Sequence, residues 1–327
     1  MLKQVKQLLG KAEAPRAVPA SPLISIIVIV YDMPTQAENT INSLRVDYQQ
    51  GVESSDYEVI LIENESPNLV SPEFIKTFPS NFRYVHRKEA ESSPVQAINY
   101  GASLARGSHI CLMIDGARML TPGVVKNIIL GHRLHEHAVV SIPGYHLGHE
   151  LQQEAVKTGY GVQAERELIE SIDWPKNGYR LFDISCFSGS SAPGFFLPNS
   201  ESNCLSIPRE IWSALGGCDT RFNLRGGGLT NLDLYKRACE YPGVQHVIVP
   251  GEGTFHQFHG GVTTGGENEK ATEAYMGSSK EQYRELRGEE YECPETNPVF
   301  LGQFPVQAQR FLHYSCEMFS AHSCPTS

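Results

Sequence analysis

The stretch Gly107-Ser-His-Ile-Cys-Leu-Met-Ile-Asp-Gly-Ala-Arg118 decides the fold of this chain. It is an apolar run that delivers one carboxylate, Asp115, onto a turn containing glycine. The strands of a parallel sheet are buried on both faces and therefore read as continuous apolar runs, and ligands bind at the carboxyl ends of such strands. The stretch predicts a buried parallel strand that presents Asp115 at the edge of a sheet.

Two apolar runs upstream also end in polar side chains. Residues 25–30 are followed by Tyr31 and Asp32, and residues 57–62 are followed by Glu63. Because the carboxyl ends of parallel strands meet at one edge of a sheet, these side chains are expected to converge with Asp115.

Helical segments alternate with the apolar runs. The patterns predict helices at 35–48, 71–77, 94–106 and 122–135, a strand at 82–86 and a fourth long strand at 138–142. Alternating strands and helices of this kind form a mostly parallel, doubly wound α/β sheet.

The regular alternation ends near residue 142, and strand and helix signals return near 203. Residues 143–202 mix glycine, serine, proline and aromatic residues without a sustained period, and irregular segments of this length usually carry function or cover a site. We expect a tail and linker at 1–22, one domain at 23–265 with this large insertion, and a helical and irregular extension at 266–327.

Composition limits the classes of function. The net charge of −10 argues against nucleic-acid binding, which needs a basic face. Eight cysteines without a C-x-x-C pair indicate a reducing cytoplasm. The sequence contains no run of eighteen apolar residues, so it predicts no membrane span. A short basic amphipathic helix at 2–11 would at most place the chain peripherally on the inner membrane surface.

The order of these strand ends resembles the nucleotide-sugar-binding half of the family 2 glycosyltransferases, which have the GT-A fold. The resemblance covers roughly residues 22–262. It implies a transferase that moves a sugar from a nucleoside diphosphate donor to a hydroxyl of a glycan or other acceptor, in polysaccharide or glycan assembly. Residues 23–142 would bind the nucleotide, and residues 143–265 would form the acceptor side.

The same resemblance assigns the residues that bind the donor nucleotide. Tyr31, Asp32 and Glu63 would lie around the nucleobase and ribose. The implied donor-binding set is Tyr31, Asp32, Glu63, Asn99, Asp115 and Arg118. The alternative interpretation is that polar residues simply end buried strands.

Asp115-Gly-Ala117 occupies the position of the D-x-D motif of this family, in which acids contact the ribose and a divalent ion that bridges the phosphates. Alanine cannot ligate a metal, so a site for Mn²⁺ or Mg²⁺ would need Asp115 with another ligand, or the cation Arg118 in place of the metal. His256 and His259, in the glycine-flanked segment 251–261, could supply imidazole ligands to such a site.

Residues 226–237 occupy the place of the E-D-x-D-L motif of this family. Thr230 and Asn231 replace the usual pair of acids, whereas Asp233 remains. Asp233 is therefore the expected catalytic base, because an acceptor hydroxyl is barely acidic. Its alternative role is to stabilise the helix N-terminus. The segment also resembles an element of retaining sugar transferases, so the stereochemical outcome stays open.

The acceptor side is expected to contain four further polar residues. They are Glu201 and Asn203 before a strand, Asp219 in the turn Gly216-Gly-Cys-Asp219, and Asn231. One alternative function is a catalytically degenerate protein that binds nucleotide or glycan without turnover, since acids are missing from two motifs. A nucleotidyltransferase is a second alternative, but residues 31–35 lack the glycine-rich basic loop that it would need.

Overall fold

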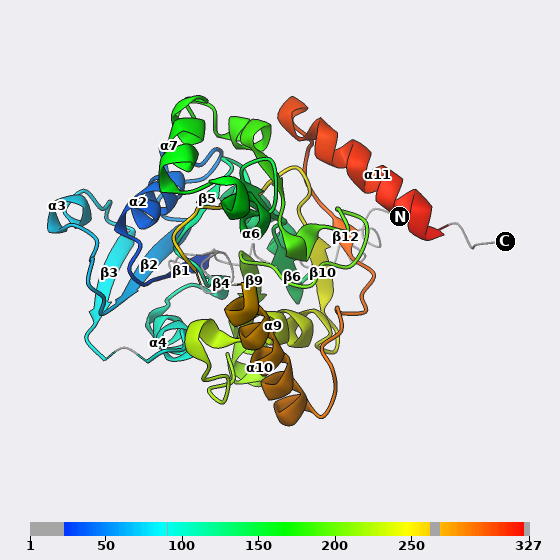
Figure 1. The fold of residues 1–327 in the computed structure, drawn as a ribbon. Helices are drawn as coiled ribbons and strands as arrows, with labels where there is room; N and C mark the ends of the chain where they lie inside the picture. The colour runs from blue at the N-terminus through cyan, green and yellow to red at the C-terminus, as the bar shows by residue number, and fades with distance from the viewer. Residues whose placement is uncertain (1–22, 90, 262–268, 324–327) are drawn as a thin grey trace, which may run out of the picture.

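The computed structural model describes residues 23–89, 91–261 and 269–323 (Figure 1). An eight-stranded sheet with the order β12-β10-β6-β9-β4-β1-β2-β3 forms its centre. Its strands are β1 (Ile24–Val30), β2 (Tyr57–Asn64), β3 (Phe82–Arg87), β4 (His109–Met113), β6 (Ala138–Ser141), β9 (Leu205–Pro208), β10 (Gln245–Ile248) and β12 (Val299–Phe300). All neighbouring strands are parallel except where β9 pairs with β4 and β6. The mostly parallel sheet predicted from the sequence is confirmed.

Helices cover both faces of this sheet, which explains why its central strands β1 and β4 are buried and mainly apolar. The helices are α2 (Pro34–Ser43), α3 (Pro72–Ile75), α4 (Val95–Leu104), α5 (Val124–Leu134), α6 (Gln152–Ala155), α7 (Val162–Glu170), α8 (Arg209–Leu215), α9 (Thr230–Cys239), α10 (Glu269–Arg287) and α11 (Gln309–Ser323). Apolar residues of α2 and α5 pack on one face, and those of α4, α8, α9 and α10 pack on the other.

A smaller sheet with the order β5-β11-β7-β8 lies next to the large one. Its strands are β5 (Arg118–Leu120), β7 (Gly144–Leu147), β8 (Ser185–Phe187) and β11 (Thr254–His256). Because β5 follows β4 after one short turn, Asp115 lies at the junction of the two sheets. Two strands of the small sheet, β7 and β8, come from the segment 143–202 that was expected to be irregular.

An aromatic core supports the small sheet. The Tyr145 ring stacks on the rings of Phe187 and Phe255, with centroid separations of 5.0 Å in both cases. Phe311 of α11 meets the Tyr145 ring edge-on at 4.9 Å. The C-terminal segment therefore contributes to the same structure: α11 packs on the small sheet, and β12 extends the large one.

The helix predicted at 35–48 ends earlier than expected, because α2 stops at Ser43. The Gln49 side chain folds back, and its Nε2 donates hydrogen bonds to the carbonyl oxygens of Ser43 and Thr121. The first bond satisfies a carbonyl at the helix end, and the second ties the following turn to the segment before α5. The helix predicted at 2–11 lies outside the described residues.

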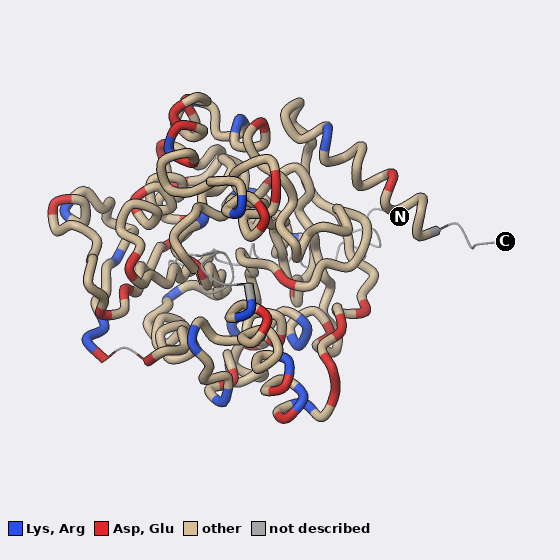
Figure 2. The backbone as a smooth tube through the Cα atoms, in the orientation of Figure 1, with Lys and Arg blue, Asp and Glu red and all other residues tan. Residues whose placement is uncertain are grey.

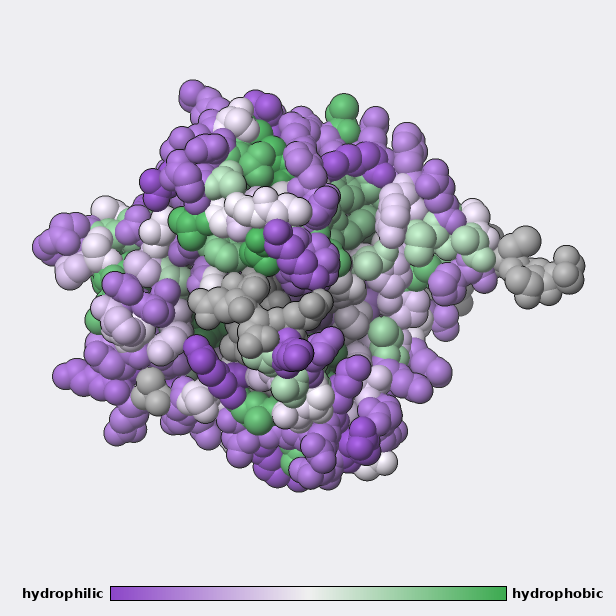
Figure 3. Space-filling model, in the orientation of Figure 1, coloured by the Kyte–Doolittle hydropathy of each residue, from purple (hydrophilic) through white to green (hydrophobic). Residues whose placement is uncertain are grey.

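The surface carries both signs of charge. Acidic and basic residues are interspersed along the chain in Figure 2. Hydrophilic side chains cover most of the face shown in Figure 3, with apolar ones between them. Within the described residues, no helix has both the length and the apolar character required to cross a bilayer.

Candidate functional site

Asp115 occupies a turn that glycine makes sterically accessible. The Gly116 amide donates a hydrogen bond of 2.7 Å to the carbonyl oxygen of Ile29 in β1. A Cβ atom at Gly116 would lie 2.5 Å from Cγ2 of Val30 and 2.7 Å from that carbonyl oxygen, so a larger residue would collide with β1. The Asp115 carboxylate in turn accepts a hydrogen bond of 3.0 Å from the Ala117 amide. The turn therefore holds the carboxylate at the carboxyl end of β4.

The histidine segment is fixed against the same turn by strand pairing. Strand β11 pairs antiparallel with β5, which places His256 opposite Arg118. The backbone amide of Gln257 donates to the Ala117 carbonyl oxygen at 2.8 Å. The buried Gln257 side chain donates through Nε2 to the carbonyl oxygen of Gln36 in α2 at 3.0 Å. These contacts fix the segment after β11 against α2 and against the turn that carries Asp115.

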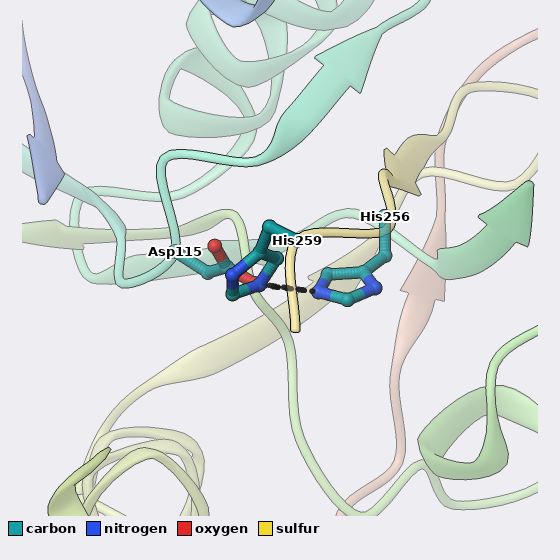
Figure 4. A group of neighbouring side chains, drawn as sticks. All are labelled: Asp115, His256 and His259. Carbon is teal, nitrogen blue, oxygen red and sulfur yellow. Dashed lines mark hydrogen bonds and ion pairs between the residues drawn. The ribbon is translucent and has the colours of Figure 1, made fainter. Parts of the chain in front are cut away.

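Asp115, His256 and His259 converge on one point (Figure 4). The His256 Nε2 lies 2.8 Å from Asp115 Oδ2 and 3.2 Å from His259 Nε2. The His259 Nε2 lies 3.6 Å from Asp115 Oδ2. All three ligand atoms lie within 4.8 Å of one another, and His256 is only 4% exposed. The expected grouping of these three residues is present in the structure.

The insertion orients His256. Gln152 of α6 donates through Nε2 to the His256 carbonyl oxygen at 2.9 Å, and its Oε1 lies 2.6 Å from His256 Nδ1. Because an amide oxygen only accepts hydrogen bonds, the proton of a neutral His256 belongs on Nδ1. The lone pair of Nε2 then faces Asp115 and His259. This is the arrangement in which an outer-shell partner fixes a histidine as a metal ligand.

A second residue of the insertion, Glu165 of α7, holds the backbone between the two histidines. Both of its carboxylate oxygens accept from the Phe258 amide, at 2.9 and 2.8 Å. Burial raises the pKa of Glu165 to about 7, although hydrogen bonds from Phe258 and Tyr160 oppose the rise. Neither Gln152 nor Glu165 was predicted from the sequence. No local sequence pattern marks a residue whose role is to orient the side chain or backbone of a ligand residue.

The charges of the cluster are strongly coupled. Burial alone would raise the pKa of Asp115, but His259 and His256 hold it well below its usual range. Burial lowers the pKa of His256 to about 4, whereas Asp115 outweighs burial and raises the pKa of His259. An ionised carboxylate, a neutral imidazole lone pair and a second imidazole thus share one point, which is a donor set suited to a divalent cation such as Mn²⁺.

Arg118 is a buried cation beside this cluster. It is 7% exposed, and its Nε lies 3.9 Å from Asp115 Oδ2. Neither Nε nor Nη1 has a hydrogen-bond partner among the described residues. A buried guanidinium nitrogen without a hydrogen bond is costly, so these two nitrogens mark a place where an anionic ligand would be stabilised.

Ala117 departs from the D-x-D motif for a structural reason. Its side chain is fully buried in the apolar cluster between the sheet and helices α2 and α5. A carboxylate at this position would lie in an apolar core rather than beside Asp115. The histidines of the β11 segment supply side-chain ligand atoms next to Asp115 instead.

A second polar group lies where the chain enters β9. The Asn231 amide donates to Glu201 Oε2 at 2.5 Å and lies 3.4 Å from Asn203 Oδ1, and the Asn203 amide donates to Glu201 Oε1 at 3.3 Å. Asn203 and Asn231 are buried, while Glu201 is half-buried. Three of the four residues expected on the acceptor side therefore form one cluster.

Asp233 and Asp219 belong to a different region, between α8, α9 and α10. Asp233 is fully buried, and its carboxylate accepts from Arg237 at 2.8 Å and from Arg287 at 2.5 and 2.9 Å. Asp219 pairs with Arg221 at 2.6 Å and with Arg287 at 3.0 Å. Within the described residues, none of these contacts involves Asp115, Arg118 or the histidines. The geometry does not favour the prediction that Asp233 is the base.

Asn99 also lies in this second region rather than near Asp115. Its amide donates to the Cys218 carbonyl oxygen at 2.8 Å, and its Oδ1 accepts from the Cys218 amide at 3.0 Å. A cavity of about 500 Å³ is lined by Asn99, Asp219 and Arg287 among others. Asn99 therefore fixes the turn after α8, and a donor contact by its side chain stays a prediction.

Of the remaining predicted donor residues, Tyr31 and Asp32 follow β1, and Glu63 lies near the end of β2. Tyr31 is 49% exposed, and Asp32 adopts a positive φ of 55° while accepting from Asn68 at 2.8 Å. Glu63 is fully buried and accepts from the Val70 amide at 3.0 Å and the Tyr84 hydroxyl at 2.6 Å. Exposed Tyr31 and Asp32 are free to meet a ligand, whereas Glu63 supports the loop that follows β2.

Comparisons with known proteins agree with this fold. Residues 25–177, just under half of the chain, match the family model described as glycosyl transferase family 2. No curated protein sequence matches the chain. The segment that matches contains the strand ends and Asp115.

Solved structures with a similar fold are glycosyltransferases. S. aureus TarS 1-349 in complex with UDP-GlcNAc is 11% identical, with 91% of this chain and 72% of that chain covered and a TM-score of 0.50. The mannosyltransferase PcManGT from Pyrobaculum calidifontis, in complex with GDP-Man and Mn²⁺, is 13% identical, with coverages of 97% and 75% and a TM-score of 0.50. The chain covers 33% of a longer S. aureus TarS chain, with a TM-score of 0.45.

The doubly wound sheet, the acid at the end of β4 and these similarities define a protein of the GT-A fold. Residues 25–177 are similar to glycosyl transferase family 2, and the similarity to solved structures extends over most of the chain.

Proposed function

We propose that this chain transfers a sugar from a nucleoside diphosphate sugar to a hydroxyl acceptor, in the assembly of a polysaccharide or other glycan. The observation that carries the proposal is the buried guanidinium of Arg118 beside Asp115, His256 and His259, because its Nε and Nη1 have no hydrogen-bond partner among the described residues. A diphosphate suits both Arg118 and the cluster of Asp115, His256 and His259. It offers anionic oxygens to the guanidinium and to a cation that the cluster would hold.

The donor atoms fit a divalent cation. Asp115, His256 and His259 would hold Mn²⁺ or Mg²⁺, and the two imidazoles favour Mn²⁺. The chemistry that such a cation supplies when bound is charge neutralisation at the departing diphosphate. Arg118 would supply further positive charge from the protein itself, and Gln152 would keep the His256 lone pair directed into the site.

The nucleoside would lie at the ends of β1 and β2. Tyr31 offers an exposed ring for stacking, and Asp32 offers a carboxylate for a ribose or base donor. Glu63 would act indirectly by holding Val70 and Tyr84. The complexes of structural neighbours with UDP-GlcNAc and with GDP-Man support a nucleotide-sugar donor of this general kind.

A cytoplasmic location, at most peripheral to the inner membrane surface, is part of the same proposal. Seven cysteines in the described part of the chain are free thiols, and Cys111 and Cys204 remain unbonded with their sulfur atoms 3.7 Å apart. Buried thiols in such proximity are compatible with a reducing compartment.

Binding without turnover is the second candidate function. Ala117 is part of the core, and Asn231 stands where the family has an acid. Either change could remove a group that catalysis needs while leaving the nucleotide site intact.

A donor screen distinguishes these functions. Isothermal titration with UDP, GDP and dTDP, with and without Mn²⁺, is expected to find one nucleotide that binds more tightly with the metal. The corresponding sugar donors are then assayed with glycan acceptors for released nucleoside diphosphate. Binding without release would favour the non-catalytic alternative, and the absence of binding by every nucleotide would overturn the proposal.

A further inference from the structure

Glu201 reaches the same edge of the large sheet as Asp115. Strand β9 runs antiparallel to β4, with Leu205 opposite Leu112. The chain therefore enters β9 at the edge where β4 leaves the sheet for Asp115. Residues 201–203 lie before β9 at that edge, on the opposite side of β4 from β1.

The charge around Arg118 links the two polar groups. Asp115 and Glu201 both act on the Arg118 guanidinium, opposing the lowering of its pKa by burial. The strand order independently places residues 201–203 at the sheet edge where β4 leads to Asp115 and Arg118. Asp233 has no such relationship in the described residues, because Arg237 and Arg287 occupy its carboxylate.

Two buried amides orient the Glu201 carboxylate. Asn231 Nδ2 contacts one carboxylate oxygen and Asn203 Nδ2 contacts the other. The Asn231 Oδ1 is buried and has no hydrogen-bond partner among the described residues. An unpaired buried acceptor next to a half-buried carboxylate is suited to a ligand that offers hydroxyl donors, as a sugar does.

This arrangement also explains Asn231 at the position of an acid. An aspartate there would place two carboxylates within hydrogen-bond distance, and one of them would have to be protonated. An asparagine instead donates a hydrogen bond to the Glu201 carboxylate. The charge expected at position 231 is therefore supplied from position 201.

We propose that Glu201 is the catalytic base, positioned by Asn231 and Asn203. This inference rests on the proposed glycosyl transfer. The acceptor oxygen forms a bond to the anomeric carbon while the bond from that carbon to the diphosphate oxygen breaks. The hydroxyl proton moves to Glu201, and the electron pair of the broken bond leaves with the nucleoside diphosphate, next to Arg118. A single displacement of this kind inverts the anomeric carbon.

The test compares Glu201→Gln with Glu210→Gln. Glu210 is a glutamate on α8 whose side chain is 65% exposed. Glu201→Gln is expected to lower kcat by about 10²- to 10⁴-fold and to remove the acid limb of the pH profile of kcat/KM. Its Kd for the nucleoside diphosphate should stay within about twofold, since the base contacts the acceptor. Glu210→Gln should change neither quantity.

Asn231→Asp provides a second variant that keeps Glu201. Two adjacent carboxylates share their protons, so the acid limb of the profile is expected to move to higher pH. An unchanged limb would contradict the contact between position 231 and the base.

The outcomes separate this inference from the proposed function. Wild-type protein that binds nucleotide but transfers no sugar would overturn the proposed function and this inference with it. Wild-type transfer together with near-normal kcat in Glu201→Gln would overturn only the assignment of Glu201. If Glu201→Gln does not fold, as judged by its thermal midpoint, Glu201→Asp replaces it. That variant should retain the acid limb at reduced kcat, and loss of the limb would overturn the assignment.

Discussion

The Nε2 atom of His256 lies 2.8 Å from the Oδ2 atom of Asp115, and the proton position set by Gln152 leaves both atoms as acceptors. Two acceptors at this distance repel unless a proton or a metal ion lies between them. The cluster is therefore a site that changes its affinity for protons when it binds a cation.

Loss of either histidine is expected to weaken binding of Mn²⁺. His256→Ala and His259→Ala each remove one of three protein ligands. The Kd for Mn²⁺ should rise at least about tenfold, because even substitution of a residue that only hydrogen-bonds to a metal ligand has an effect of this size. Titration monitored by electron paramagnetic resonance measures free Mn²⁺ directly. His313→Ala, on the exposed face of α11, is the matched control. Equal affinities in all three variants would contradict the proposed ligands.

Arg118→Met is expected to have opposite effects on binding and on stability. The loss of charged hydrogen bonds to the diphosphate should weaken nucleotide affinity by about 1.5–3 kcal/mol. The ligand-free protein should be as stable as wild type or more stable, because a buried charge with two nitrogens that lack hydrogen bonds is replaced by an apolar side chain.

Calorimetry and thermal unfolding of the Arg118 variant measure the two effects. Arg221→Met, at an arginine that is 61% exposed, should leave affinity unchanged. A large fall in the stability of the Arg118 variant without a change in affinity would assign Arg118 to the fold alone.

Asp233→Asn separates a catalytic from a structural role for this aspartate. The substitution leaves Arg237 without a carboxylate partner and Arg287 with Asp219 alone, and stability is expected to fall by about 3 kcal/mol, as when one member of a buried ion pair is removed. Turnover per folded molecule should stay within about threefold of wild type if the residue only holds α9 and α10 together. Urea unfolding and kcat measured on the same sample decide the matter, and a selective fall in kcat would restore Asp233 as the base.

Glu58 is expected to make stability depend on pH in the acid range. Burial would raise the pKa of Glu58, but hydrogen bonds from Ser25 and Arg106 and the charge of Arg83 outweigh burial and lower it. A lowered folded-state pKa gives stability that is complete above the unfolded value near 4.3 and is lost as pH falls through the folded value.

Glu58→Gln should therefore lower the free energy of unfolding at pH 7 by about 1–2 kcal/mol, a value reduced because Arg106 is half exposed. The difference between the two proteins should shrink as pH falls below about 4. Urea titrations at both pH values test this, and Glu210→Gln is the control. A difference that does not depend on pH would mean that the Glu58 charge is unimportant.

Local patterns were sufficient to predict the sheet, and the three expected metal ligands lie together in the structure. The apolar runs that end at Val30 and Met113 are long enough to be recognised as buried strands, and such strands in a parallel sheet deliver their carboxyl ends to one edge. His256 and His259 were recognisable because glycines flank them. Their grouping with Asp115 was implied by the resemblance to GT-A enzymes.

What the sequence by itself determined is which residue types stand at the ends of buried strands, because apolar runs and glycines act over a few neighbouring residues. Only the tertiary structure decided how each of these side chains is used. Asp233 and Glu201 are both acids near motif positions, but the α10 arginine Arg287 neutralises the first and the amide of Asn231 orients the second. Gln152 reaches His256 across the small sheet. These contacts join distant parts of the chain, and electrostatic environment depends on distance in space rather than on separation in sequence.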